Sequence, residues 1–416
     1  MLKNYDFLLL LLGRFITNFG DSIYTIATMS LVYNMTGSTL YTGLALFLTS
    51  IMGIFQLILS PILDRINMKR FLILSQLCQG ILLLIIPLLK IMGALEVYHV
   101  LIIMPIVSFI NQLVYPGQLS LLPKIMDESK LIAANSLFSI AYQGTDAIFN
   151  ALSGVVILAY GLMSAYYIDS ATFFINSFLF LFLSRAVSEV NSSSSSKNEN
   201  LISSHFSRLK SGLKLWKNEI LFPLLLGVII INFAASGIYS ILPAYSENEL
   251  YYSLFLSASG IGILLGSFIA NLGYVKKIKL GKVYIYGIAL AGLAWMGMSL
   301  FDSMHASNSI ITILLFTAGW VFIGMLNIYS QTIVQLMIPK ESVAGAMGGM
   351  IGLSVALAPL GALLGGFLGK YFILTDVIKF FGVLIMLVSC YWMLQGALKK
   401  MGSLNEVQAE RISEAR

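Results

Sequence analysis

Charged residues are scarce in this sequence. Only 11% of its 416 residues are charged and 58% are apolar, whereas a soluble protein carries roughly 25% charged residues. Water cannot solvate so much apolar surface, so lipid must surround much of the chain. The scarcity of charge therefore excludes an ordinary soluble globular protein.

Cysteines, histidines and catalytic motifs are also sparse. The two cysteines, Cys78 and Cys390, lie inside apolar stretches and form no disulfide framework. The three histidines have no metal-ligand spacing, and the sequence holds neither a Gly-x-x-x-x-Gly-Lys-[Ser/Thr] loop nor a Gly-x-Ser-x-Gly turn. We therefore expect no enzyme, no metal site, no cofactor and no ATPase within the chain.

Long apolar runs are what the sequence has instead. A helix needs about 20 mostly apolar residues to cross a bilayer, and twelve runs meet that requirement. They predict an all-α membrane protein with twelve transmembrane helices. The predicted spans cover residues 7–33, 40–62, 71–92, 98–120, 133–159, 164–184, 220–243, 249–274, 282–301, 309–333, 343–369 and 374–397.

The basic residues determine the expected orientation of these spans. With both termini in the cytoplasm, 22 of the 25 Lys and Arg residues lie on the cytoplasmic side, as the positive-inside rule requires. These residues are spread over separate loops, so the net charge of +6 indicates topology and no nucleic-acid partner. We expect a monomeric, multi-pass plasma-membrane protein whose partners are the lipid bilayer and a small-molecule substrate.

The sequence also contains a weak internal repeat. The pair Asn18-Phe19 recurs 214 residues later as Asn232-Phe233, and further matches keep offsets between 208 and 216 residues. Near-constant offsets indicate two pseudo-symmetric six-helix halves in parallel orientation, a plan found in transporters whose halves rock around a midplane site. The predicted division is an amino-terminal bundle, a serine-rich cytoplasmic linker, a carboxy-terminal bundle and a cytoplasmic tail, at residues 1–184, 185–218, 219–400 and 401–416.

The loop after the second span resembles that of a known family. It reads SPILDRINMKRFL from Ser60 to Leu72, which is similar to the signature loop of the major facilitator superfamily, although Ser60 and Asn67 replace glycines of that family. The resemblance implies the major facilitator fold and a conformational latch of charge-assisted hydrogen bonds. A plain positive-inside turn is the alternative. The latch residues would be Asp64, Arg65, Lys69 and Arg70.

Other stretches resemble the macrolide-efflux-type drug exporters of that superfamily, namely Gly13–Asp21, Leu122–Ser136 and Tyr167–Phe173. The resemblance implies secondary active export of drug-like or amphipathic molecules, with macrolides as one class. Transport would proceed by proton antiport with alternating access, with the proton gradient as the energy source. Export of siderophores, other metallophores or peptides is the alternative within transport. A lipid flippase or a non-transporting immunity or sensor protein is the alternative from another class.

Ionisable residues inside the predicted spans are candidate functional residues, because a charge in a bilayer is costly. Arg14 and Asp21 lie seven residues apart on one face of the first span, in a polar stripe that we expect to face the central cavity. Burial favours the protonated form of a carboxyl group, so Asp21 could load and release a coupling proton beside Arg14. The alternative is a structural acid paired with Arg14 or with a neighbouring helix.

Two further acids lie in the fifth and sixth spans. Asp146, near the middle of the span at 133–159, is the second proton-coupling candidate, with an interhelical hydrogen bond as the alternative. Asp169 lies nearer the outer end of the span at 164–184, where we expect a structural role.

Candidate substrate contacts follow from the resemblance, because spans one, four, seven and ten line the cavity in the resembled fold. Amides and phenols beside apolar walls suit a bulky amphipathic solute, while interhelical packing is the alternative for each residue. The candidates are Tyr24, Asn111, Gln112, Tyr115, Asn232, Tyr239 and Asn327.

Overall fold

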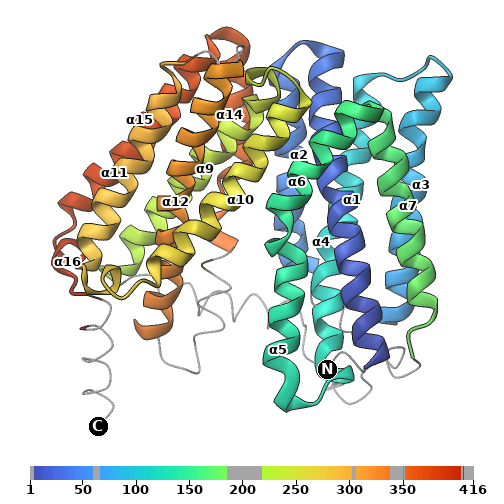
Figure 1. Ribbon diagram of the computed structural model, residues 1–416, viewed down its shortest axis with the longest axis horizontal. Coiled ribbons are helices and arrows are strands. Elements are labelled where there is room, and N and C mark those ends of the chain that lie inside the picture. The colour runs from blue at the N-terminus through green and yellow to red at the C-terminus, as the bar shows by residue number, and fades with distance from the viewer. Residues whose placement is uncertain are drawn as a thin grey trace. The chain divides into compact units, whose positions relative to one another are not determined.

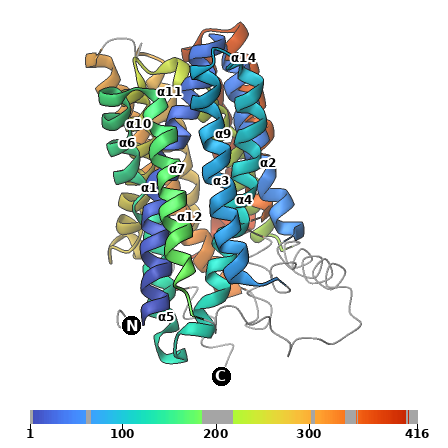
Figure 2. The ribbon, with the colours of Figure 1, turned by 90° about the vertical axis from the view of Figure 1, so that its right-hand side faces the viewer.

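The computed structural model describes residues 4–59, 66–184, 218–301, 306–337, 350, 352–403 and 406. This part of the chain is built from helices (Figures 1 and 2), and its only β pairing is an isolated bridge between Lys279 and Ser403. The first helices are α1 (Tyr5–Thr36), α2 (Thr39–Leu59), α3 (Met68–Ile91), α4 (Val97–Ile125), α5 (Glu128–Ser139), α6 (Asp146–Tyr160) and α7 (Leu162–Leu181). The later helices are α9 (Leu221–Tyr245), α10 (Glu249–Ala270), η6 (Val275–Lys277), α11 (Leu280–Met298), α12 (Ala306–Met337), α14 (Ala358–Tyr371), α15 (Leu374–Leu394) and α16 (Gly396–Lys400).

The helices coincide with the predicted spans. In the described residues, eight helices are long and apolar enough to cross a membrane by length and composition. The helices α1 and α7 are 32 and 20 residues long and are more polar, because they carry buried charged and amide side chains. The prediction of an all-α membrane protein is confirmed.

Two predicted spans are not single continuous helices. The span at 133–159 is divided by a π-helical turn at Ile140–Gly144, after which α6 begins at Asp146. In the span at 343–369, a turn at residues 355–357 separates the helical residues 352–354 from the helix α14. This helix begins at Ala358 with Pro359 in its first turn, a position that suits proline because the amide hydrogen is not needed there. Because α6 begins at Asp146, this residue lies at a helix start, whereas the sequence predicted the middle of a helix. Single π-helical turns such as the one before it are frequent at functional sites.

The chain divides into two compact units. The first unit consists of Met1–Gly37, Leu48–Ile202 and Asn248–Ser257, and the second of Ser38–Phe47, Ser203–Glu247 and Ala258–Arg416. The predicted linker at 185–218 lies outside the described residues except for Asn218. Each unit thus takes most of its residues from one predicted half, and the domain boundaries themselves stay a prediction.

In the first unit, α1 is the central helix. It contacts α4, α6 and α7 (Figure 1), and most of its side chains from Phe7 to Val32 are buried. A helix covered on several sides can keep polar groups in its interior only if neighbouring helices supply partners. The polar residues of α1 are therefore the place to look for the site.

In the second unit, α14 packs against α9 through glycines. A Cβ atom at Gly361 would overlap the backbone of Phe233, and one at Gly365 would overlap the backbone of Gly237. Lipid tails are as apolar as the helix side chains, so the hydrophobic effect does not drive membrane helices together. Small residues let their backbones approach closely and pack by van der Waals contact instead.

Candidate functional site

The candidate site is centred on an ion pair between two residues of α1. Nη2 of Arg14 lies 3.1 Å from Oδ2 of Asp21, and the side chain of Arg14 is fully buried while that of Asp21 is 20% exposed. Nδ2 of Asn111 in α4 donates to the same carboxylate oxygen at 2.9 Å. The spacing of seven residues puts Arg14 and Asp21 on one face of the helix, two turns apart. The pairing that the sequence left as the structural alternative is thus present, and it leaves Asp21 partly open.

The polar stripe of α1 is less open than the sequence predicted. Asn18 is 6% exposed and Thr28 is fully buried, because α6 and α7 cover this side of α1. The hydroxyl of Thr28 lies 3.0 Å from that of Tyr166 in α7. Of the stripe, Asp21 is part-exposed and Thr25 is exposed. The prediction that the whole stripe faces a cavity is therefore wrong.

A second carboxylate lies at the break between α5 and α6. Nδ2 of Asn18 donates to Oδ1 of Asp146 at 2.9 Å and to Oγ1 of Thr145 at 2.8 Å. Both acceptors stand where the π-helical turn ends and α6 starts, so the break brings them to α1. Asp146 is part-exposed. One amide thus connects α1 to both Thr145 and Asp146 at this break.

Replacing Asn18 with leucine is expected to destabilise the protein by about 1.5–3 kcal/mol, because hydrogen bonds to charged groups contribute that much and the carboxylate of Asp146 would lose its donor. The loss should be read from the unfolding midpoint in detergent. Thr25→Val is the matched control on the same helix, because the Thr25 side chain is exposed and its hydroxyl bonds only its own helix, at the carbonyl of Asp21. Equal midpoints for the two variants would contradict the role of Asn18.

A third carboxylate lies behind α1. Asp169 of α7 is fully buried, and its Oδ1 accepts a hydrogen bond from Oγ1 of Thr172 at 3.1 Å. A Cβ atom at Gly20 would overlap Oδ1 of Asp169 and Oγ1 of Thr172. The absence of a side chain at Gly20 therefore lets the carboxyl group of Asp169 lie against the backbone of α1. The sequence assigned Asp169 only a structural role.

The sequence also missed a chain of buried amides. Asn176 of α7 donates to Gln76 of α3 at 2.8 Å, Gln76 donates to Gln79 at 3.1 Å, and Gln79 donates to the carbonyl of Val107 in α4 at 3.2 Å. All three side chains are fully buried. The spacing of Gln76 and Gln79 on one helix face was the available signal. Side-chain hydrogen bonds of this kind hold membrane helices together.

The predicted latch is only partly described. Asp64 and Arg65 lie outside the described residues. Nζ of Lys69 donates to the carbonyls of Leu181 and Leu183 at 2.8 and 2.6 Å, so it caps the carboxyl end of α7. The backbone amide of Arg70 bonds the side chain of Asn67 at the start of α3. Lys69 thus fastens α3 to α7 in the first unit.

Among the candidate substrate contacts of the first unit, buried and open residues are mixed. Tyr24 is 7% exposed and meets Tyr166 edge-on at 5.8 Å, and Asn111 binds Asp21 as described above. Tyr115 is part-exposed and stacks on Phe138 at 6.3 Å, and Gln112 is part-exposed. The open members, Gln112 and Tyr115, lie on α4 together with Asn111.

The candidates of the second unit are likewise mixed. The amide of Asn232 donates to the carbonyls of Val228 and Ser354, each at 3.1 Å, which is the packing role given as the alternative. Asn327 is part-exposed. Tyr239 is part-exposed and stacks on Trp320 at 5.7 Å. Beneath this pair lie the buried rings of Phe316 and Trp295, so Tyr239 is the open edge of an aromatic cluster.

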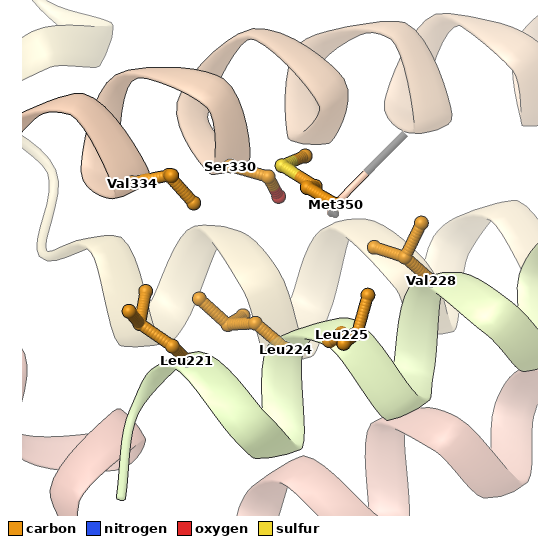
Figure 3. A pocket seen from close by; sticks show the side chains of 7 residues that line it. All are labelled: Leu221, Leu224, Leu225, Val228, Ser330, Val334 and Met350. Atoms are coloured by element: carbon orange, nitrogen blue, oxygen red, sulfur yellow. The ribbon is translucent and has the colours of Figure 1, made fainter. Parts of the chain in front are cut away.

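A small apolar pocket also lies in the second unit (Figure 3). Its free volume is only about 10 Å³, roughly what a single water molecule needs. Its single hydroxyl, that of Ser330, faces the hydroxyl of Tyr284 at 3.0 Å. The pocket is lined by Leu221, Leu224, Leu225, Val228, Ser330, Val334 and Met350.

The two units differ in charge. In the first unit Arg14, Asp21, Asp146 and Asp169 lie well inside the helical layer or at a helix break. In the described part of α9 to α15, charged side chains stand only near helix ends or in loops. No group of three or more His, Cys, Asp or Glu side chains in the described residues could hold a metal ion. The ionisable chemistry therefore belongs to the first unit.

Comparison with known proteins identifies similar sequences. The pattern described as Major Facilitator Superfamily matches residues 10–359. The chain is 24% identical over 322 residues to YvqJ, an uncharacterized MFS-type transporter of Bacillus subtilis (strain 168), covering 75% of this chain and 73% of that one. It is 22% identical over 371 residues to YfiS, another uncharacterized MFS-type transporter of that strain, covering 86% and 85%.

Solved structures share the fold at low sequence identity. A bacterial homolog of the human lysosomal transporter Spinster gives a TM-score of 0.70 at 12% identity, covering 95% of this chain and 97% of that one. The nucleoside transporter NupG gives 0.71 at 15% identity, covering 95% and 99%. A bacterial homologue of the iron transporter ferroportin gives 0.66 at 14% identity, covering 95% and 98%. At these identities the likeness shows the fold alone.

Proposed function

Because the chain belongs to the Major Facilitator Superfamily, we propose that it is a secondary active exporter of drug-like or amphipathic molecules, macrolides among them, driven by proton antiport. The observation that supports this most is the set of carboxylates around α1. Asp21 is held by Arg14 and Asn111, and Asp146 is held by Asn18. Ionisable residues within membrane helices mark proton relays in pumps and transporters.

In this proposal Asp21 and Asp146 bind the coupling protons, and Arg14 competes with the proton for Asp21. A proton on Asp21 removes the negative charge that holds Arg14, so loading breaks the ion pair and unloading restores it. The pair is therefore a two-state element of the kind that coupling requires. Alternating access would move the two halves around a midplane site, with Asp64, Arg65, Lys69 and Arg70 as the latch.

The cargo is proposed from the aromatic and amide residues. Aromatic faces bind apolar groups without strict geometry, and Tyr239 presents such a face next to Trp320. Gln112 and Tyr115 are part-exposed on α4. These residues suit a bulky solute with an aromatic or apolar body. From the positive-inside count we propose the plasma membrane with both termini in the cytoplasm.

A second candidate is a lipid flippase, and the apolar pocket favours it. Six of the pocket's seven lining side chains are apolar, and the hydroxyl of the seventh, Ser330, is already bonded to Tyr284, so the lining suits an alkyl group better than a polar one. Reorientation of fluorescent lipids in reconstituted vesicles would separate the two candidates, because a dye exporter leaves the lipid distribution unchanged.

The test is transport in inverted membrane vesicles under an imposed pH gradient. We expect the wild type to accumulate ethidium or erythromycin against their concentration gradients only when the pH gradient is present. Asp21→Asn and Asp146→Asn should each abolish the gradient-driven part, because the amide cannot exchange a proton, while Thr25→Val keeps it. Flux should be normalised to folded protein. Absence of flux of both compounds in the wild type would reject broad drug export, and lipid, peptide and metallophore assays would follow.

A further inference from the structure

We propose that Asp169 of α7 carries an exchangeable proton of the transport cycle and passes it to Asp21 across the backbone of α1 at Gly20. The inference rests on the proton coupling proposed above and adds a third carboxyl group to it. The sequence pattern suggested only a structural acid at this position, and the observations below argue for more.

The first observation is the burial of a carboxyl group that is poorly solvated by the protein. Asp169 is fully buried, and of its two carboxyl oxygens only Oδ1 accepts a hydrogen bond from Thr172. Oδ2 has no hydrogen-bond partner among the residues that the structure describes. An ionised carboxylate without compensation in an apolar interior costs several kcal/mol or more. The group is therefore neutral in this conformation, which means that it holds a proton.

The second observation is the set of ionisable groups that face Asp169. From α1 these are Asp21, which follows Gly20 in sequence, and Tyr24, whose ring meets that of Tyr166 in α7, three residues before Asp169. Arg14 on α1 is paired with Asp21, and Asp146 of α6 is bonded by Asn18. The α3 face that packs on α7 presents the neutral amides Gln76 and Gln79. A like charge is thus the principal charge near Asp169, and two such carboxyls share protons more readily than they both ionise.

The third observation is a repeat in the contact between α1 and α7. A Cβ atom at Gly13 would overlap Oδ1 of Asn176, just as one at Gly20 would overlap Oδ1 of Asp169. The two glycines are seven residues apart, and so are Asn176 and Asp169 on the antiparallel partner. At Gly13 the side-chain amide of Asn176 occupies the position against the glycine, and this amide donates to Gln76. An amide thus occupies the equivalent place at Gly13, although its Oδ1 also has no hydrogen-bond partner among the described residues, and the carboxyl at 169 offers what an amide cannot, which is a removable proton.

The proposed step conserves charge. The O–H bond of Asp169 breaks and leaves a carboxylate, and the proton forms an O–H bond on Asp21, which becomes neutral and releases Arg14. Gly20 adjoins Asp21 in sequence, so a small shift of α1 along α7 changes the exposure of both groups together. One negative and one positive charge are present before and after the step.

The experiment compares the wild type with Asp169→Asn, each reconstituted as the full chain in proteoliposomes and loaded with ethidium. We expect Asp169→Asn to lose accumulation driven by a pH gradient while it keeps gradient-independent exchange of ethidium, because the isosteric amide preserves packing and binding. Gradient-driven accumulation equal to that of the wild type, or loss of both activities in folded protein, would overturn the inference.

A second measurement separates this inference from the proposed function. Infrared difference spectra over a pH titration should contain the carbonyl bands of protonated carboxylic acids, and one of these bands should be missing in Asp169→Asn. If the wild type moves no ethidium, the proposed drug export fails, and the infrared band alone then decides whether Asp169 binds a proton. An unchanged band in the variant would overturn the proton assignment whatever the cargo is.

Discussion

The free energy of unfolding of the variant Asp21→Asn is expected to be about 3–5 kcal/mol lower than that of the wild type, because removing one partner of a buried ion pair has a cost of that size. The guanidinium of Arg14 is fully buried 3.1 Å from Asp21, and asparagine removes the negative charge that balances it. The double variant Arg14→Met/Asp21→Asn should recover most of this loss, since it removes both charges. Unfolding midpoints in detergent give the comparison.

Arg14→Met alone should lower the free energy of unfolding by less than Asp21→Asn alone does. The carboxyl group left behind can neutralise itself by taking up a proton, whereas an arginine stays charged at every accessible pH. If the losses of the two single variants simply add up in the double variant, the two side chains do not interact, and the ion pair that we place at the centre of the site would be refuted.

The second large effect is expected in the second unit, at the seam of α9 and α14. Gly365→Leu should prevent folding, because the new Cβ meets the backbone of Gly237 and not a side chain that can turn away. Overpacking of a core costs about 1–3 kcal/mol and more when the backbone must move. Yield of monodisperse protein and the unfolding midpoint measure the effect.

Gly53→Leu is the matched control for that experiment. Gly53 also lies inside a predicted membrane helix, α2, but a Cβ atom there would have nothing within 4 Å. Leucine is also a better helix former than glycine, by roughly 1 kcal/mol. The control should therefore fold at least as well as the wild type, and equal damage in both variants would show that glycine content alone, and not the seam, matters.

The fold was predictable because apolar runs about as long as a bilayer is thick have few other uses. The predicted spans coincide with helices for that reason. What the runs could not reveal is the interruption at Ile140–Gly144, since Ala, Tyr and Gln there interrupt no hydrophobic pattern strongly enough. The late start of α14 was signalled by Pro359, which is common in a first helical turn.

The site was predictable only where it is local. Arg14 and Asp21 lie on one helix, so helical periodicity placed them on one face, and their pairing was the alternative given for Asp21. The bonds from Asn111 to Asp21 and from Asn18 to Asp146 join residues 90 and 128 positions apart, and no periodicity within one segment reports such a contact. For the same reason Asn18 was noted as part of a polar stripe and not as the donor to Asp146. The cargo contacts and the latch stay predictions.

The uneven distribution of charge between the units has a consequence for the membrane potential. A unit charge that moves through the whole field gains or loses about 2.3 kcal/mol per 100 mV, and the described spans of the second unit carry charge only near their ends. Voltage therefore acts on this molecule mainly through Arg14 and the three aspartates of the first unit. Apart from any charge that the cargo itself carries, the voltage sensitivity of transport should be set mainly by the amino-terminal unit.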